Sequence, residues 1–104
     1  MQLQTEKLQT EKHLQRYLRR EVLKVGATFD KLESRSRRGW PDCLIVKGGR
    51  CWFVELKSPS GTGVLSANQA RVVADLKSHG ADVRVISQVY EVSALLREVS
   101  DVNA

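Results

Sequence analysis

The sequence predicts one mixed α/β domain with secondary-structure elements in the order αβββαβα. Three observations support this prediction. Apolar residues recur at three- to four-residue spacing in residues 11–25, which is typical of an amphipathic helix. Two apolar segments flank Gly48-Gly49, a dipeptide suited to the positive φ angles of a tight hairpin turn. The chain of 104 residues is long enough for a single core and too short for two.

The first half of the chain is predicted to form one helix and three strands. The helix begins near Glu11 and ends at Gly26, since glycine commonly terminates helices. A strand over residues 27–32 follows, and the basic loop 33–39 separates it from the hairpin. The hairpin strands are expected at residues 41–47 and 50–57, and the apolar stripe of the helix consists of Leu14, Leu18, Val22 and Val25.

The second half is predicted to contain two helices separated by one strand. A loop rich in Gly, Ser and Pro leads to a helix that Ser66 caps and Gly80 ends. A short β-favouring segment and a closing amphipathic helix come next. The expected ranges are 58–64 for the loop, 66–79 for the helix, 82–87 for the strand and 89–98 for the closing helix, with a frayed lead-in over residues 1–9 and a flexible tail over residues 100–104.

The composition is that of a globular protein with a basic surface. Lys+Arg 17 against Asp+Glu 12 leaves a net charge of +5, which favours polyanions such as nucleic acid as partners without establishing them. The sequence contains no apolar run long enough to span a membrane and no apolar signal segment at its start, so we expect a cytoplasmic location. Cys43 and Cys51 then stay reduced, and the hairpin places them on opposite faces.

Two carboxylates interrupt the hairpin strands. In a hairpin with a two-residue turn, Lys47 faces Arg50, and counting outward places Asp42 opposite Glu55. Opposed Cβ atoms are about 4.5 to 5.5 Å apart, and like charges there are destabilising. A divalent cation that prefers carboxylate, carbonyl and water ligands would compensate this repulsion. The alternative is a structural ion cluster with Lys57, which lies two residues further along the same face.

Glu11 is a candidate third carboxylate. At 100° per residue it falls about 20° from the centre of the helical apolar stripe, whereas Glu6 falls about 120° away. Glu11 is therefore expected to point toward the core. If this helix packs on the Asp42 face of the sheet, Glu11 becomes a third oxygen ligand; otherwise it is a solvated residue or a partner of the helix dipole.

Four motifs together resemble those of the VRR-NUC domain, a branch of the PD-(D/E)xK nuclease superfamily. They are RRGWPD at residues 37–42, the GGR turn, FVELKSP at residues 53–59 and LSANQ at residues 65–69. The similarity covers about residues 10–88. It implies a restriction-endonuclease-like core with a mixed central sheet flanked by helices.

The resemblance also implies a metal site. Asp42, Glu55 and the main-chain carbonyl of Leu56 would hold Mg²⁺ or Mn²⁺, and Glu11 would complete the site directly or through water. Lys57 would position or activate the attacking water. No organic cofactor is expected.

Gln69 corresponds to a helix glutamine that lies near the scissile phosphate in the family. Its position three residues after Ser66 also fits a capping box, and both roles can hold.

Residues next to Asp42 are candidates for DNA contact. Trp40 could stack on or wedge into a distorted base step, or could simply pack within the fold. The arginines of the preceding loop could bind the phosphate backbone or form a solvated loop, and Lys31 matches a lysine common on the first strand of family members. The complete set is Lys31, Arg35, Arg37, Arg38 and Trp40.

Three departures from the family pattern bear on loop conformation and substrate preference. Arg35-Ser36 stands where the basic loop usually carries Pro-Gly, and Cys43 stands where an arginine often follows the aspartate. The loop before LSANQ is also slightly long.

The predicted function is that of a divalent-metal-dependent DNA endonuclease. Stand-alone members of the family resemble Holliday junction resolvases and act as homodimers, so branched DNA is the expected substrate. One alternative is a non-catalytic nucleic-acid-binding module with a vestigial cation site. A sequence-specific restriction-type nuclease is a further alternative, although the chain has no evident recognition domain.

Overall fold

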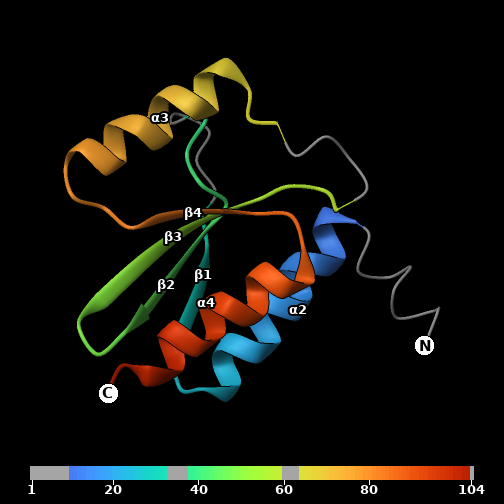
Figure 1. Ribbon diagram of the computed structural model, residues 1–104, viewed down its shortest axis with the longest axis vertical. Helices are drawn as coiled ribbons and strands as arrows, with labels where there is room; N and C mark the ends of the chain where they lie inside the picture. The colour runs from blue at the N-terminus through green and yellow to red at the C-terminus, as the bar shows by residue number, and fades with distance from the viewer. Residues whose placement is uncertain (1–9, 33–37, 60–63, 104) are drawn as a thin grey trace.

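The computed structural model describes residues 10–32, 38–59 and 64–103, and it has the predicted α/β order αβββαβα (Figure 1). Within these ranges, four strands form the central sheet and three helices flank it. The fold class predicted from the sequence is therefore confirmed. The elements are α2 (Glu11–Lys24), β1 (Thr28–Lys31), β2 (Cys43–Lys47), β3 (Arg50–Leu56), α3 (Ala67–Ser78), β4 (Val83–Ile86) and α4 (Val89–Asp101).

The sheet has the strand order β1-β2-β3-β4, so the hairpin β2–β3 lies at its centre. The first three strands are antiparallel, whereas β4 runs parallel to β3 after a crossover through α3. Gly48 and Gly49 both have positive φ, at 56° and 82°, as a tight turn between twisted strands requires. Lys47 pairs with Arg50, and each pair further from the turn, as far as Cys43 with Val54, has the predicted partners. The predicted hairpin register is therefore correct.

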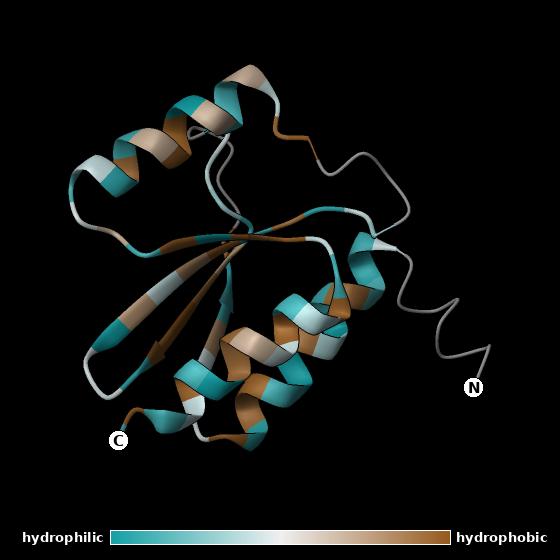
Figure 2. Cartoon of the chain, viewed as in Figure 1, coloured by the Kyte–Doolittle hydropathy of each residue, from teal (hydrophilic) through white to brown (hydrophobic). Residues whose placement is uncertain are grey.

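The two faces of the sheet are covered unequally. Helices α2 and α4 pack on one face, which we call the α2/α4 face, and the apolar sides of these elements meet there in Figure 2. The opposite face, the α3 face, is covered by α3 near β4, where Val73 and Val83 are buried. Leu44 and Phe53 on the α3 face remain half-buried. The main core consists of Leu14, Leu18 and Val22 of α2, Val92, Leu95 and Val99 of α4, and Cys43, Ile45, Trp52, Val54, Leu56 and Ile86 of the sheet, with Ala27.

The C-terminal helix is longer than predicted. It continues to Asp101, so Ser100 and Asp101, which were expected in a flexible tail, are helical. Tertiary contacts explain the difference, because Val102 packs against the core and Lys47 Nζ donates a hydrogen bond to the Ser100 carbonyl at 3.3 Å.

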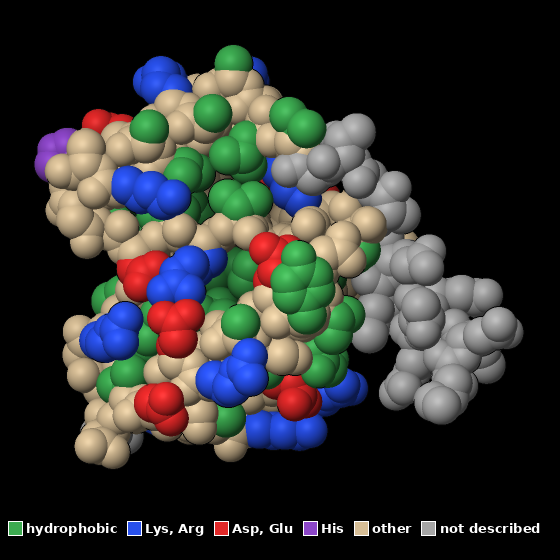
Figure 3. Space-filling view, in the orientation of Figure 1, with side chains coloured by type: hydrophobic (Ala, Val, Ile, Leu, Met, Phe, Trp, Pro, Cys, Tyr) green, Lys and Arg blue, Asp and Glu red, His purple; other side chains and the backbone are tan. Residues whose placement is uncertain are grey.

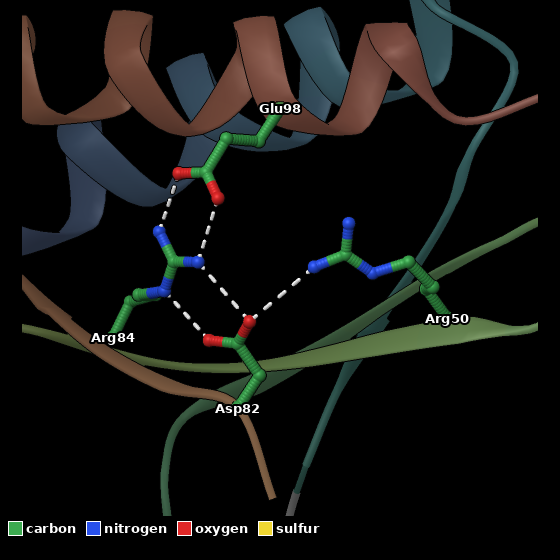
Figure 4. A network of polar contacts seen from close by, with 4 residues as sticks. All are labelled: Arg50, Asp82, Arg84 and Glu98. Carbon is green, nitrogen blue, oxygen red and sulfur yellow. Dashed lines mark hydrogen bonds and ion pairs between the residues drawn. The ribbon is translucent and has the colours of Figure 1, made fainter.

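An ion network on the α2/α4 face joins β4 to α4 (Figure 4). The Arg84 guanidinium donates to both oxygens of Glu98, at 2.6 and 2.8 Å, and to both oxygens of Asp82, at 2.6 and 3.1 Å. Arg50 lies 3.7 Å from Asp82 and stacks over Trp52. Figure 3 shows charged side chains of both signs side by side on this part of the surface. We refer to these four charged residues as the Arg84 network.

The two cysteines behave as the hairpin predicts. Cys43 is buried, Cys51 is exposed, and both are free. Among the helices in the described ranges, none is both long and apolar enough to cross a membrane.

Candidate active site

Asp42 lies at the open end of the central hairpin. The last β2–β3 pair is Cys43 with Val54, so the next position outward places Asp42 opposite Glu55 as predicted. Two hydrogen bonds fix Asp42: its Oδ2 accepts from the Leu56 N–H at 2.8 Å, and its carbonyl accepts from the Leu32 N–H at 2.7 Å. The aspartate is thus held between β1 and β3.

Pro41 leaves the main-chain carbonyl of Leu56, next to Asp42, without a hydrogen-bond donor from β2. Continuing the register outward brings the buried Pro41 opposite Leu56, at a position where the two residues of a ladder exchange both hydrogen bonds. Proline has no N–H and cannot donate to the Leu56 carbonyl. The Asp42 side chain meanwhile satisfies the Leu56 N–H. The Pro-Asp sequence therefore places a carboxylate beside a main-chain carbonyl that β2 cannot satisfy.

Glu55 is buried with one of its oxygens unsatisfied. The side chain is 2% exposed, and its Oε2 accepts from Gln69 Nε2 at 2.9 Å and lies 3.4 Å from Lys57 Nζ. Its Oε1 is one of three buried side-chain polar atoms in the described ranges that have no hydrogen-bond partner. A buried polar atom without a protein partner is rare, and an ion or a water molecule bound at this oxygen would satisfy it.

Burial and mutual repulsion act on both carboxylates. Burial, together with the charge of Asp42, raises the pKa of Glu55 to about 7, although Lys57 opposes the change. Burial also raises the pKa of Asp42, against the opposing effects of the Leu56 N–H and of Lys57. The ionised forms are disfavoured in this environment, so Lys57 alone does not compensate the two negative charges.

Gln69 connects this site to the start of α3. Its Oε1 accepts from Lys57 Nζ at 2.7 Å and from the Ser66 N–H at 2.9 Å, while Ser66 Oγ accepts from the Gln69 N–H at 3.1 Å. The capping box and the contacts with Lys57 and Glu55 therefore exist together. The side chain that helps to cap the start of α3 also orients the lysine and the glutamate.

Glu11 occupies a different position from the one expected. Helix α2 covers the α2/α4 face and not the face of Glu55, and Glu11 is exposed because it is the first residue of the helix. It nevertheless lines the same hollow as Asp42, and its pKa is raised by burial and by the Asp42 charge. The expectation that Glu11 points into the core is wrong. Helical periodicity shows which side of a helix is buried, but not how far the buried part extends toward its first residue.

The donors around Asp42 suit a hard divalent cation. Asp42, the free Oε1 of Glu55 and the Leu56 carbonyl are the oxygen ligands that Mg²⁺ or Mn²⁺ prefers. The third carboxylate does not join them: within residues 10–32, 38–59 and 64–103, no group of three or more His, Cys, Asp or Glu side chains is arranged to hold a metal ion. The fit therefore depends on two carboxylates and one carbonyl.

Comparison with known proteins identifies a solved structure with a similar fold. A solved structure described as a VRR_NUC domain is 30% identical to this chain, covers 84% of it, and is itself covered over 94% of its length, with a TM-score of 0.76. The chain belongs to the VRR-NUC family. No family model matches the sequence, and no curated protein matches it.

In this VRR-NUC domain, Gly39 and Trp40, two of the described residues before Asp42, pack against α3 and β3. Gly39 has a φ of 85°, and a Cβ atom there would collide with Asn68 at about 3 Å, so this position requires glycine. Trp40 packs edge-to-face on Phe53, with ring centroids 5.9 Å apart. The packing interpretation of Trp40 is thus supported by a contact.

Of the predicted basic residues, Lys31 and Arg38 lie within the described ranges. Lys31 lines the hollow beside Asp42, and its charge opposes the rise in the pKa of Asp42. Arg35 and Arg37 fall outside the described residues.

Sequence reasoning missed a second group of basic side chains in this VRR-NUC domain. Lys12, Arg16 and Arg19 line the hollow next to Glu11 and Asp42. Their spacing of four and three residues places them on one helix face and was a usable signal. It was overlooked because only the apolar stripe of this helix was considered.

Proposed function

We propose that this chain is a divalent-metal-dependent endonuclease that hydrolyses phosphodiester bonds in DNA. The observation that carries the proposal is the free, buried Oε1 of Glu55 at a hairpin position opposite Asp42. A charged pair with raised pKa values is costly for folding and is typical of functional sites. Membership in the VRR-NUC family supports a nuclease-type activity.

The residues of the site have separate roles in this proposal. Asp42, Glu55 and the Leu56 carbonyl would hold Mg²⁺ or Mn²⁺, with Glu11 close enough to contribute through water. A bound divalent ion supplies an acidified water and neutralises charge on the phosphate. Lys57 places a positive charge next to the attacking water, and Gln69 keeps the lysine oriented through its 2.7 Å hydrogen bond.

The substrate is proposed to be branched DNA, such as a Holliday junction, cleaved by a homodimer in the cytoplasm. The support is the resemblance to stand-alone VRR-NUC proteins together with the net charge of +5. A chain of 104 residues offers little surface for gripping a duplex, so two copies give the contact area that one lacks.

A cleavage assay over a panel of substrates tests the proposal. Labelled four-way junctions, forks, flaps, linear duplex and single-stranded DNA and RNA are incubated with Mg²⁺, Mn²⁺ or Ca²⁺. The proposal predicts cleavage with Mg²⁺ or Mn²⁺, fastest on a branched DNA, and little with Ca²⁺. Protein that is folded by circular dichroism yet inert on every substrate and metal would overturn it.

The second candidate is a non-catalytic nucleic-acid-binding module. It is favoured by the absence, among the described residues, of a cluster of three metal-binding side chains, and by the way that Lys57 and Gln69 already satisfy one oxygen of Glu55. In that case the inert protein would still bind the same DNA, and its affinity would not depend on Asp42.

A further inference from the structure

A hollow of about 660 Å³ opens beside Asp42, between α2 and the edge strand β1. Phe29 and Leu56 line it, and so do the carboxylates Glu11 and Asp42. The side chains contributed by the exposed face of α2 are Lys12, Gln15, Arg16 and Arg19. This hollow is therefore continuous with the candidate active site.

The three cations of α2 form one row. At 100° per residue, Lys12, Arg16 and Arg19 fall within about 60° of one another on the helix surface, and all three are exposed. The row is about 10 Å long, since seven residues separate its ends at 1.5 Å of rise each. That length is comparable to the separation of two or three successive phosphates along one DNA strand.

The row differs from the other cations of the same helix. Arg20 and Lys24 pair with Glu21, at 3.4 and 2.9 Å. None of the ion pairs found within the described ranges involves Lys12, Arg16 or Arg19. The charges of these three cations are therefore left for a partner other than the described acidic side chains.

Acidic residues also line the hollow and limit what it can bind. An isolated anion gains little next to these carboxylates, because their negative charge offsets the attraction of the cations. The carboxylates are Glu11, Asp30 and Asp42, and the cations are Lys12, Arg16, Arg19 and Lys31. A polyanion gains more, because it can place successive charges along the α2 row while its next phosphate reaches Asp42 through a metal ion. Extended phosphodiester backbone fits this charge pattern.

We propose that Lys12, Arg16 and Arg19 bind two or three consecutive phosphates of the DNA strand on one side of the scissile bond. The inference rests on the proposed function, because it takes Asp42 as the place of the scissile phosphate. The row thereby fixes the direction in which the cleaved strand leaves the site along α2. It binds DNA without reading sequence.

The test compares two double variants with the same loss of charge. Arg16→Ala/Arg19→Ala removes two cations of the row, and Arg20→Ala/Lys24→Ala removes two cations outside it. Fluorescence anisotropy with a labelled 30-base-pair duplex and a four-way junction, in Ca²⁺ and about 50 to 200 mM NaCl, gives the affinity and its dependence on salt. Thermal unfolding confirms that both variants are folded.

The row predicts a specific change in salt dependence. Losing two phosphate contacts should lower the magnitude of the slope of log K against log [NaCl] by about 1.8, and the affinity near 0.1 M salt should fall at least about tenfold. The control double variant should stay within about twofold of the wild type. Equal losses in the two double variants, or no loss in either, would overturn the inference.

Cleavage measurements separate this inference from the proposed function. If the wild-type protein cleaves DNA, Arg16→Ala/Arg19→Ala should raise KM about tenfold with kcat little changed. If the wild-type protein cleaves DNA and Arg16→Ala/Arg19→Ala has the same KM and the same slope of log K against log [NaCl], the inference about the row is rejected and the proposed nuclease function stands. A different outcome is that the wild-type protein cleaves no DNA, while Arg16→Ala/Arg19→Ala has a smaller slope of log K against log [NaCl] than wild type. That outcome would reject the nuclease and support the row as a DNA-binding surface.

Discussion

Two charged clusters on this small sheet differ in how well their charges are matched. In the Arg84 network, each oxygen of Asp82 and Glu98 accepts a guanidinium hydrogen bond, and these bonds hold the pKa of Glu98 below its usual value (Figure 4). At the open end of the hairpin, Glu55 keeps an oxygen without a partner and its pKa rises to about 7.

The contrast separates charges that stabilise the fold from charges retained for another reason. The Arg84 network joins β4 to α4 and leaves no carboxylate oxygen unsatisfied. The pair of Asp42 and Glu55 opposes folding whenever both are ionised. A binding partner that supplies positive charge, such as a divalent cation, would remove that penalty.

The largest expected effect is the difference in cleavage rate between Asp42→Asn and Asp82→Asn, which make the same change in the two clusters. If Asp42 holds the metal as proposed, Asp42→Asn should reduce cleavage of branched DNA by roughly a thousandfold, because it would remove a ligand while preserving shape. Asp82→Asn should leave the rate per folded molecule within a few-fold of wild type and lower the melting temperature. Rates and thermal unfolding measured side by side check both outcomes, and similar losses of activity in the two variants would contradict the distinction.

A smaller loss of cleavage is expected at Lys57. Lys57→Met should slow cleavage by about a hundredfold, since in the proposed mechanism it removes the positive charge beside the attacking water. Lys47→Met serves as the control, because Lys47 contacts the Ser100 carbonyl at the far end of the hairpin. Single-turnover kinetics measures the chemical step directly, and an unchanged rate in Lys57→Met would remove the lysine from the mechanism.

Metal-free stability should depend on pH through Glu55. Its pKa is about 7 in the folded protein against an ordinary value of 4.5, so the folded state binds the proton more tightly. The resulting stability is complete below pH 4.5 and is lost as pH rises through 7, by about 2 to 3 kcal/mol.

Urea unfolding of metal-free protein at pH 5 and pH 8 checks this dependence. Wild type should be less stable at pH 8, and Glu55→Gln should lose most of the difference. Glu98 contributes in the opposite sense, because its lowered pKa gives stability that is lost only as pH falls below 4.5. Identical pH profiles for wild type and Glu55→Gln would show that Glu55 ionises normally.

The smallest effect is expected in the Arg84 network. Arg84→Met should lower the free energy of unfolding by about 1 to 2 kcal/mol, a modest value because the arginine side chain is 32% exposed. Its cleavage rate per folded molecule should not change. Chemical denaturation and an activity assay on the same sample measure the two quantities, and a loss of activity beyond the loss of folded protein would link the network to catalysis.

The sequence was sufficient to predict the hairpin and its consequences. The Gly48-Gly49 turn fixes the register, and the register alone places Asp42 opposite Glu55. The capping box of Ser66 and Gln69 was equally readable, because it depends on residues three positions apart. Local spacing determines each of these features.

Features that depend on tertiary packing could not be predicted in the same way. The apolar stripe shows which side of α2 is buried but not how far the buried part extends toward the first residue of the helix, so the expectation that Glu11 points toward the core was wrong. Nothing local pairs Arg84 with Glu98, which lies 14 residues further along the chain on a separate helix. The sequence also predicted too early an end for α4. The helix continues to Asp101 because Val102, the next residue, packs against the core.

Calorimetric titration of metal-free protein with Mn²⁺ at about pH 6.5, where Glu55 still holds its proton, tests the central claim most directly. The structure predicts that wild type binds Mn²⁺, that Asp42→Asn binds it at least about tenfold more weakly, and that Asp82→Asn binds it as wild type does. Proton release on binding should appear as a dependence of the heat on the buffer, since Glu55 must ionise. No Mn²⁺ binding by wild type at millimolar concentration, or equal binding by wild type and Asp42→Asn, would contradict a metal site at Asp42 and Glu55.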